Sequence, residues 1–200
     1  MKKVIVTQRF EKIGKHRELR DNLDIRLCNL IEKLGYGSIP LPNNLKNINK
    51  FIYQISPHAI ILSGGGDPLK KDKRRKNEFK LIQYSLKKKI PLIGICRGAQ
   101  VLNIYFGGKI MKIRNHVRKK HKIYGPLIGK KQNISVNSFH DYGFNQNLLG
   151  KDLKILASSS DKIIESFCHN KHKLLGIMWH PERYKKLKKF DKNLFKKMIN

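Results

Sequence analysis

The fold is decided by the stretch Ile90-Pro91-Leu92-Ile93-Gly94-Ile95-Cys96-Arg97-Gly98-Ala99-Gln100, which continues into the apolar run 101–106. The residues before the cysteine predict a buried strand and those after it a helix, so the chain turns sharply at Cys96. Glycines two positions before and after the cysteine suit a crowded turn that leaves little room for a Cβ. We interpret the stretch as a nucleophile elbow, with Cys96 at a helix N-terminus where backbone N–H groups favour a thiolate. The alternative is a buried, inert cysteine in a glycine-containing turn.

Strands and helices alternate along the first half of the chain. Apolar runs predict strands at 3–7, 36–41 and 59–62, and helices are expected at 17–34, 47–55 and 75–88. Strands joined by helices are typical of a parallel sheet covered on both faces. We therefore expect an α/β fold with an open, mostly parallel central sheet.

The second half has shorter apolar runs separated by turns. They predict strands at 132–137, 153–158, 163–168 and 173–178, followed by a basic amphipathic helix at 186–199. Two of the gaps have hairpin length, which indicates a smaller antiparallel extension of the same sheet. We expect a single domain over residues 1–200.

Composition limits the class of protein. Three widely spaced cysteines in 200 residues indicate neither a disulfide framework nor a cysteine-rich metal site, and we expect no metal or other cofactor. A reducing cytoplasm fits this cysteine usage. The N-terminal apolar run ends before Gln8, too soon for a signal peptide, and no run approaches the length of a membrane span.

The formal net charge of +30 makes nucleic acid the first partner to consider. The aromatic residues do not interleave with the basic runs as in a stacking platform, so we do not expect nucleic acid to be the functional partner. Two basic clusters follow predicted strand ends, where they could flank a ligand site or remain solvated. The first cluster is Lys70, Lys71, Lys73, Arg74, Arg75 and Lys76, and the second is Lys112, Arg114, Arg118, Lys119, Lys120 and Lys122.

A cysteine nucleophile needs a base and a group that orients the base. The sequence Trp179-His180-Pro181-Glu182 follows an apolar strand, and proline keeps the residue before it extended. In an extended chain, residues two apart lie on the same side, so Glu182 can reach one ring nitrogen of His180. The alternative is a strand-end histidine followed by a turn.

The loop Ser63-Gly64-Gly65-Gly66-Asp67 follows a predicted strand directly. Consecutive glycines offer backbone N–H groups without side-chain cover, which suits an oxyanion or a phosphate. The loop lacks the Lys-Ser/Thr ending of a nucleotide-binding P-loop. Beside the elbow, it would complete an oxyanion hole.

Four ordered motifs together resemble the class I glutamine amidotransferase superfamily, which has a flavodoxin-like sheet. They are Ser63-Gly64-Gly65-Gly66-Asp67, Gly94-Ile95-Cys96-Arg97-Gly98-Ala99-Gln100, Val136-Asn137-Ser138-Phe139-His140 and Gly176-Ile177-Met178-Trp179-His180-Pro181-Glu182. The Cys-Arg-Gly-x-Gln form is similar to the stand-alone γ-glutamyl hydrolases (peptidase C26 and the γ-glutamyl-γ-aminobutyrate hydrolase group). The resemblance covers nearly the whole chain, from Val4 to Glu182.

The resemblance implies a role for each matching residue. Cys96 would be the nucleophile, His180 the general base and acid, and Glu182 its orienting group. Backbone N–H groups of Gly65 and Arg97 would form the oxyanion hole. The glutamyl group would be held by Gly64, Gly66, Gln100, Asn137, Ser138, Phe139 and His140, with no chemical step assigned to His140.

Three functions remain open. The first is hydrolysis of a γ-glutamyl amide of a small metabolite. If the basic clusters flank the pocket, that metabolite carries phosphate or several carboxylates, and γ-glutamyl-CDP-amidate of capsule phosphoramidate synthesis fits best. The second is the glutaminase subunit of a two-chain amidotransferase, which the arginine after Cys96 disfavours. The third is a basic nucleic-acid-binding protein. The oligomeric state is not indicated.

Overall fold

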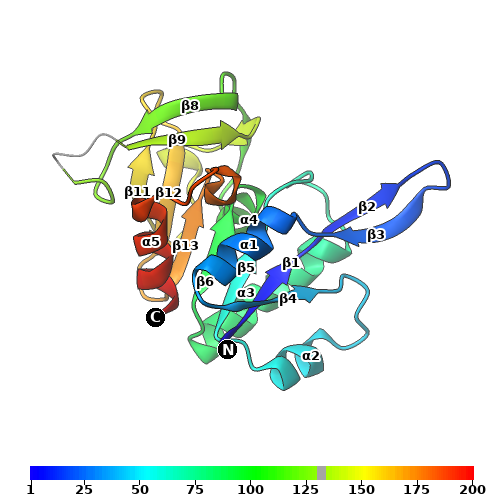
Figure 1. Ribbon diagram of the computed structural model, residues 1–200. Helices are drawn as coiled ribbons and strands as arrows, with labels where there is room; N and C mark the ends of the chain where they lie inside the picture. The colour runs from blue at the N-terminus through cyan, green and yellow to red at the C-terminus, as the bar shows by residue number, and fades with distance from the viewer. Residues whose placement is uncertain (130–133) are drawn as a thin grey trace.

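Seven strands form one central sheet in the computed structural model, which describes residues 1–129 and 134–200 (Figure 1). From one edge to the other, the strands are β11 (Leu153–Ser158), β12 (Ile164–His169), β13 (Leu174–Ile177), β6 (Leu92–Ile95), β5 (Ala59–Leu62), β1 (Lys3–Thr7) and β4 (Gly37–Leu41). The five strands from β13 to β4 run parallel. β12 pairs antiparallel with β13, and β11 pairs antiparallel with β12.

Helices cover both faces of this sheet. On one face, α1 (Ile25–Lys33) and α5 (Lys189–Ile199) share an apolar core with the sheet. On the other face lie α2 (Ile48–Ile55), α3 (Lys73–Lys88) and α4 (Arg97–Tyr105). β5 and β6 are buried at every position, as strands covered on both sides must be. The expected α/β fold, including the antiparallel extension in the second half, is confirmed.

Three small two-stranded sheets lie outside the central sheet. The first is a hairpin of β2 (Arg9–Ile13) and β3 (Glu18–Asn22), which projects from the body of the protein (Figure 1). The second pairs β8 (Val117–Ile123) with β9 (Ile134–Phe139) beside the antiparallel edge. The third pairs β7 (Met111–Lys112) with β10 (Tyr142–Gly143), and the short 3-10 helices are η1 (Gln146–Leu148) and η2 (Pro181–Arg183).

The helix expected at 17–34 is wrong in its first half. Residues Glu18–Asn22 form strand β3, and the helix begins only after Asp24, whose side chain caps it by accepting a hydrogen bond from the N–H of Arg26. The helix was expected this early because Leu19 has the helical spacing of Leu23, Leu27 and Leu30, but the Leu19 side chain is 61 % exposed on the projecting hairpin. The spacing marks a buried face at Leu27 and Leu30 and not at Leu19.

The other expected elements lie within a few residues of the observed ones. The strands β5 and β11 match their predicted bounds, and α3 begins two residues earlier than predicted. Of the strand expected at 132–137, Gln132 and Asn133 lie outside the described residues, and the remainder belongs to β9. The strand β8 was not expected, because five of its seven residues are exposed and its pattern shows no apolar alternation.

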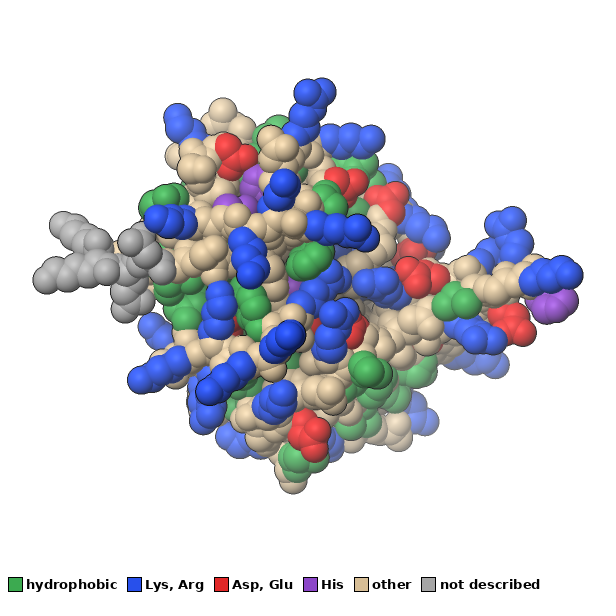
Figure 2. Space-filling view, turned by 45° about the horizontal axis from the view of Figure 1, so that its top comes forward, with side chains coloured by type: hydrophobic (Ala, Val, Ile, Leu, Met, Phe, Trp, Pro, Cys, Tyr) green, Lys and Arg blue, Asp and Glu red, His purple; other side chains and the backbone are tan. Residues whose placement is uncertain are grey.

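Basic side chains are spread over the surface rather than gathered in one patch. Figure 2 shows lysine and arginine across the whole face in view and along the projecting hairpin. Within the described residues, every helix is too short or too polar to cross a bilayer.

Candidate active site

Cys96 lies at the turn between β6 and α4, as the elbow interpretation predicts. Its φ angle is +50°, a conformation that residues with a side chain rarely adopt. The flanking glycines leave no room for a Cβ: one built on Gly98 would lie 2.1 Å from the carbonyl oxygen of Leu62, and one on Gly94 2.6 Å from the carbonyl carbon of Gly98. The crowding explains the glycines at both flanks of the cysteine.

His180 and Glu182 are in contact, as the sequence predicts, but the segment between them is not extended as expected: Pro181–Arg183 forms the 3-10 helix η2, with His180 at its N-cap. The distance between His180 Nδ1 and Glu182 Oε1 is 2.6 Å, and both side chains are buried. Gly64 shows how near His180 and Cys96 lie, because a Cβ on Gly64 would be 2.8 Å from His180 Cε1 and 3.6 Å from Cys96 Cβ. Burial alone would lower the pKa of His180, but the side chains of Cys96 and Glu182 outweigh it and raise the pKa to about 9.

Asn137, in β9, fixes the backbone of His180. Its Nδ2 donates to the carbonyl oxygen of His180, and its Oδ1 accepts from the His180 N–H, both over 2.8 Å. The backbone N–H of Asn137 in turn donates to the hydroxyl of Tyr184 over 3.0 Å. The Asn137 side chain, expected near the substrate, thus binds the segment that carries the histidine.

The glycine loop after β5 is held from behind by Arg74. The guanidinium donates to the carbonyl oxygens of Ser63 (2.6 Å), Gly64 (3.4 Å) and Gly65 (2.7 Å). Arg74 is itself paired with Glu78, from Nε to Oε1 over 2.9 Å. Three carbonyls of the loop are therefore fixed by one guanidinium, and the N–H of Ser63 donates to Thr7 Oγ1 over 3.0 Å.

Arg97 contributes its backbone, not its side chain, to the neighbourhood of Cys96. Its Nη1 donates to both carboxylate oxygens of Glu78 over 2.7 Å, inside the protein. Its backbone N–H begins α4, and neither it nor that of Gly65 has a hydrogen-bond partner among the residues described. Gly65 has a φ of +79°, which favours glycine at this position. These are the two N–H groups that the sequence predicts for an oxyanion hole, and their lack of a partner in the described residues is compatible with that prediction.

A cavity of about 250 Å³ opens beside Cys96 and His180. Eight of the twelve predicted site residues line it. Of the other four, Gly64 lies against Cys96 and His180, Glu182 is bonded to His180, and Asn137 and Ser138 do not line the cavity. The lining consists of Arg9, Gly65, Gly66, Pro68, Cys96, Arg97, Gln100, Phe139, His140, Asp141, His180 and Arg183.

Several polar groups of the predicted substrate-binding residues are engaged within the protein, whereas His140 Nε2 is buried without a hydrogen-bond partner in the described residues. Gln100 donates from Nε2 to the carbonyl oxygen of Tyr142 over 2.7 Å, which leaves its Oε1 toward the cavity without a partner in the described residues. His140 Nδ1 lies 3.0 Å from the same carbonyl oxygen. The Ser138 hydroxyl donates to the carbonyl oxygen of His116.

Two arginines in the cavity wall were not predicted. Arg9, at the base of the projecting hairpin, lies over the glycine loop, since a Cβ on Gly65 would fall 2.1 Å from its Nε. Arg183 stacks its guanidinium on Phe139, with 4.3 Å from Cζ to the ring centroid. The one signal for Arg183 in the sequence was its position directly after Glu182.

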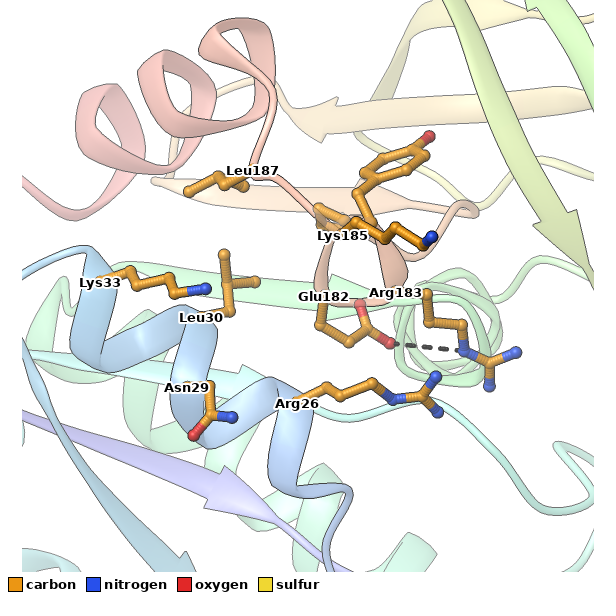
Figure 3. A pocket seen from close by; sticks show the side chains of 10 residues that line it. Arg26, Asn29, Leu30, Lys33, Glu182, Arg183, Lys185 and Leu187 are labelled. Atoms are coloured by element: carbon orange, nitrogen blue, oxygen red, sulfur yellow. Dashed lines mark ion pairs between the residues drawn. The ribbon is translucent and has the colours of Figure 1, made fainter.

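A second hollow, of about 300 Å³, lies on the far side of Glu182, between η2 and α1. Figure 3 shows Arg26 and Lys33 of α1 facing Glu182, Arg183 and Lys185 across it, with Arg183 Nε 3.9 Å from Glu182 Oε1. Cys96 and the glycine loop do not line this hollow. This hollow brings basic side chains close to the carboxylate of Glu182, but it provides no space for a substrate at the sulfur of Cys96.

Neither basic cluster lines the cavity beside Cys96, as far as the described residues show. Arg74 is buried and bound to the glycine loop, so it cannot also bind a ligand as one of a flanking cluster. Arg114 and Arg118 are exposed. The expectation that these clusters supply charge to the pocket is not supported, and Arg9 and Arg183 take that position instead.

Comparison with known proteins agrees with this geometry. Residues 18–200 match the model of the family "Glutamine amidotransferase class-I". The γ-glutamyl-CDP-amidate hydrolase of Campylobacter jejuni is 37 % identical over 185 residues, covering 89 % of this chain and 88 % of that protein. The carbamoyl phosphate synthase small chain of Saccharolobus solfataricus is 30 % identical over 75 % of this chain and 40 % of its own.

A solved structure shows the same fold. The crystal structure of a glutamine amidotransferase from Thermotoga maritima superposes with a TM-score of 0.68 over 98 % of this chain and 83 % of that chain, at 17 % identity. The match of the family model to most of the chain, together with a close relative of nearly equal extent, identifies the family. This chain belongs to the class I glutamine amidotransferases.

Proposed function

We propose that the protein is a cysteine-dependent hydrolase of γ-glutamyl amides that releases glutamate. The observation that carries the proposal is the juxtaposition at one cavity of the Cys96 thiol, the hydrogen-bonded pair of His180 and Glu182, and two backbone N–H groups without partners. These are the nucleophile, base, orienting group and oxyanion donors that acyl transfer requires.

The reaction then has two stages. The thiolate of Cys96 attacks the γ-carbonyl carbon, and the oxyanion that forms accepts hydrogen bonds from the N–H groups of Gly65 and Arg97. His180 protonates the departing nitrogen as the carbon–nitrogen bond breaks, which leaves a γ-glutamyl thioester. A water molecule that gives its proton to His180 hydrolyses the thioester, releases glutamate and restores the thiol. Glu182 stabilises the imidazolium at each stage.

The glutamyl group would lie between α4 and the end of β9. Gln100 offers an acceptor for the α-amino group, and Phe139 lines the cavity, with Ser138 beside it in β9. Gly64 and Gly66 allow close approach because a side chain at Gly64 would collide with His180.

The positive charge of the cavity bears on which amine is released as the leaving group. Arg9 and Arg183 bring two guanidinium groups to its wall, and arginine pairs well with phosphate. We therefore propose an anionic, phosphate- or nucleotide-bearing amine, with γ-glutamyl-CDP-amidate, in capsule phosphoramidate synthesis, as the specific candidate. The similarity to the Campylobacter jejuni hydrolase of that substrate supports this choice. A reducing cytoplasm, which would keep the Cys96 thiol free, is the compartment we expect.

Glutamate release from a panel of γ-glutamyl amides tests the proposal. The panel includes glutamine, a neutral γ-glutamyl amide and γ-glutamyl-CDP-amidate, and Cys96→Ala is compared with Cys168→Ala, a free cysteine at the other end of the sheet. We expect turnover by wild type and Cys168→Ala and none by Cys96→Ala. Full activity of Cys96→Ala would eliminate the mechanism.

A glutaminase subunit that passes ammonia to a separate synthase is the second candidate. The similarity to carbamoyl phosphate synthase small chains favours it. In that case glutamine would be the best substrate, and its turnover would rise sharply when the partner chain is added. Hydrolysis of the phosphate-bearing amide at a higher kcat/KM than glutamine, with no partner present, decides against it.

A further inference from the structure

Three histidines surround one buried carboxylate next to the wall of the cavity that Cys96 lines. The carboxylate belongs to Glu165 in β12, and its side chain is fully buried. His116 precedes β8, His121 lies within β8, and His140 follows β9. The four residues come from parts of the chain up to 49 positions apart, so the fold, not local sequence, brings them together.

The distances within this histidine cluster are those of metal ligands. Glu165 Oε1 lies 3.3 Å from His116 Nδ1, 3.1 Å from His121 Nε2 and 3.6 Å from His140 Nε2. Neighbouring ligands on a tetrahedral zinc ion, bound at about 2.0–2.2 Å, lie about 3.3 Å apart. The ligand atoms of His116, His140 and Glu165 all lie within 4.8 Å of one another. His121 is not part of this mutually close group, although its Nε2 lies 3.1 Å from Glu165 Oε1.

In His140 and His116, the contact made by the ring nitrogen that points away from Glu165 indicates which nitrogen carries the proton. His140 Nδ1 lies 3.0 Å from the carbonyl oxygen of Tyr142, which can only accept, so this nitrogen carries the proton. In neutral His140, Nε2 therefore presents a lone pair toward Glu165. His116 is arranged alike, with Nε2 2.9 Å from Asp161 Oδ2 and Nδ1 facing inward. Such outer acceptors are typical of metal-binding histidines.

Without a cation, the interior of the cluster is unsatisfied. The inward nitrogens of His116, His121 and His140 and both oxygens of Glu165 are buried, and none has a hydrogen-bond partner among the described residues. Lone pairs that face one another in a buried site repel, and buried polar atoms without partners are costly. One divalent cation would satisfy the three nitrogens and the carboxylate together.

We propose that His116, His121, His140 and Glu165 form a zinc-binding site. Imidazole nitrogen with a carboxylate oxygen is a ligand set that zinc prefers. His116, His140 and Glu165 are the core of the site, and His121 would turn toward them to be the fourth ligand. With four side-chain ligands the ion would be structural and would fasten β8 and β9 to β12 of the central sheet. The side chain of His121 is 16 % exposed, so the ion would enter from the side of this residue.

The site would also steady the cavity wall. Phe139 and His140 line the cavity beside Cys96, and Gln100 and His140 meet at the carbonyl oxygen of Tyr142. Fixing the end of β9 therefore fixes one wall of the cavity, although no ligand of the ion belongs to the proposed catalytic group. The proposal does not depend on the proposed function.

The test is zinc binding by the full chain after treatment with a chelator. Competition with a chromogenic chelator measures the affinity, Co²⁺ in place of zinc reports the geometry by the intensity of its visible absorption, and thermal unfolding is followed with and without zinc. We expect one zinc per chain, intense absorption typical of tetrahedral Co²⁺, and a higher Tm with zinc. Wild-type protein that binds no zinc, or binds it without any change in Tm, would overturn the proposal.

Graded variants locate the site. Asp161→Asn, which removes an outer acceptor, should weaken zinc binding about 10- to 100-fold, and Glu165→Gln should weaken it further. The double variant His169→Gln/His172→Gln, at a second histidine pair with rings 4.9 Å apart, is the matched control and should bind as wild type does. Cys96→Ala should also bind zinc normally, which separates this test from that of the hydrolase. Equal affinity in Glu165→Gln and wild type would place any bound zinc elsewhere and refute the assignment.

Discussion

The side chain of Asn137 and the backbone of His180 exchange two hydrogen bonds of 2.8 Å across 43 residues of sequence. A buried amide that satisfies both the N–H and the carbonyl of one residue fixes the position of that residue in two directions. The β8–β9 hairpin lies outside the central sheet, yet it sets the place of the histidine at the reacting centre. Loss of this contact should harm the chemistry more than the fold.

Asn137→Ala should lower kcat about 100-fold and leave KM within a few-fold, because the imidazole loses its orientation while the cavity keeps its shape. Steady-state kinetics with the best γ-glutamyl amide measures both constants. Asn137→Asp keeps one acceptor and should recover part of the rate. Asn49→Ala, at an exposed position on α2, is the control. A wild-type kcat in Asn137→Ala would show that the contact does not position His180.

Arg74→Lys should lower kcat by about 10² with a smaller change in KM. A lysine keeps the charge but cannot reach three carbonyls as the guanidinium does, so the oxyanion loop loses its fixed shape. Arg75→Lys, one position along α3 and bound to Leu69 instead of the glycine loop, is the matched control. Equal kcat values in the two variants would contradict this role.

The stability of the protein should fall as the pH rises from about 6.5 to 9. The folded protein holds the pKa of His180 at about 9, above the ordinary 6.5, so the stabilisation is complete below pH 6.5 and lost as the pH passes 9. Cys96→Ser removes a main source of the shift and should move the ring titration, followed by NMR, toward lower pH by about one unit or more. Urea unfolding at pH 6 and pH 9 gives the stability. An unchanged His180 titration in Cys96→Ser would show that the two side chains do not interact.

Arg9→Gln and Arg183→Gln should each raise KM for a phosphate-bearing γ-glutamyl amide about 10-fold or more, and for glutamine much less. The reason is that each guanidinium faces the cavity, where it would pair with phosphate. Arg114→Gln, an exposed arginine of the second basic cluster, should change neither KM. Equal effects of Arg9→Gln on both substrates would mean that the arginine does not select for charge.

Asp191→Asn should make the protein more stable at pH 7, by about 2 kcal/mol relative to its effect at pH 4. Burial raises the pKa of Asp191 to about 6. Its contribution to folding is therefore complete below about pH 3.8 and is lost as the pH rises through 6. Asparagine stays neutral and can still accept the hydrogen bond from Trp179 Nε1. Urea unfolding at both pH values measures the difference, with the exposed Asp152→Asn as control, and an equal effect at the two values would contradict the prediction.

The elements that surround Cys96 could be predicted because local chemistry specifies them. A buried strand, glycines with no space for a Cβ and a helix start must occur in one order along Gly94 to Gly98 for the turn to exist. The His180–Glu182 contact was predictable because the two residues are close in sequence, although the turn that joins them is the 3-10 helix η2 and not the expected extended segment. Arg9 could not be found in this way, because its position depends on how a hairpin folds back over Gly65.

The failures of prediction concern segments without a buried face. Leu19 has the spacing of the leucines that follow it, but it lies in β3, which leaves the body of the protein, where spacing between apolar residues carries no packing information. Leu23, after the strand, does pack against the core. β8 is mostly exposed and basic, so nothing in its pattern indicated a strand. The histidine cluster escaped notice because His116, His121, His140 and Glu165 lie at no regular spacing, and the expectation of no metal rested on cysteine usage alone.

Because Cys96 has a positive φ, the activity of the protein depends on how closely the surrounding residues are packed. A residue in that conformation keeps it only while the packed strands and the first turn of α4 enforce it. Mild denaturant, or a cavity-forming substitution far from the site, loosens this packing. Cys96 should then leave its positive-φ conformation before the rest of the fold is lost. Activity should thus be lost at a lower denaturant concentration than the helical circular dichroism signal. The difference between the two midpoints would measure how much packing is needed to hold this one turn beyond what the helices need.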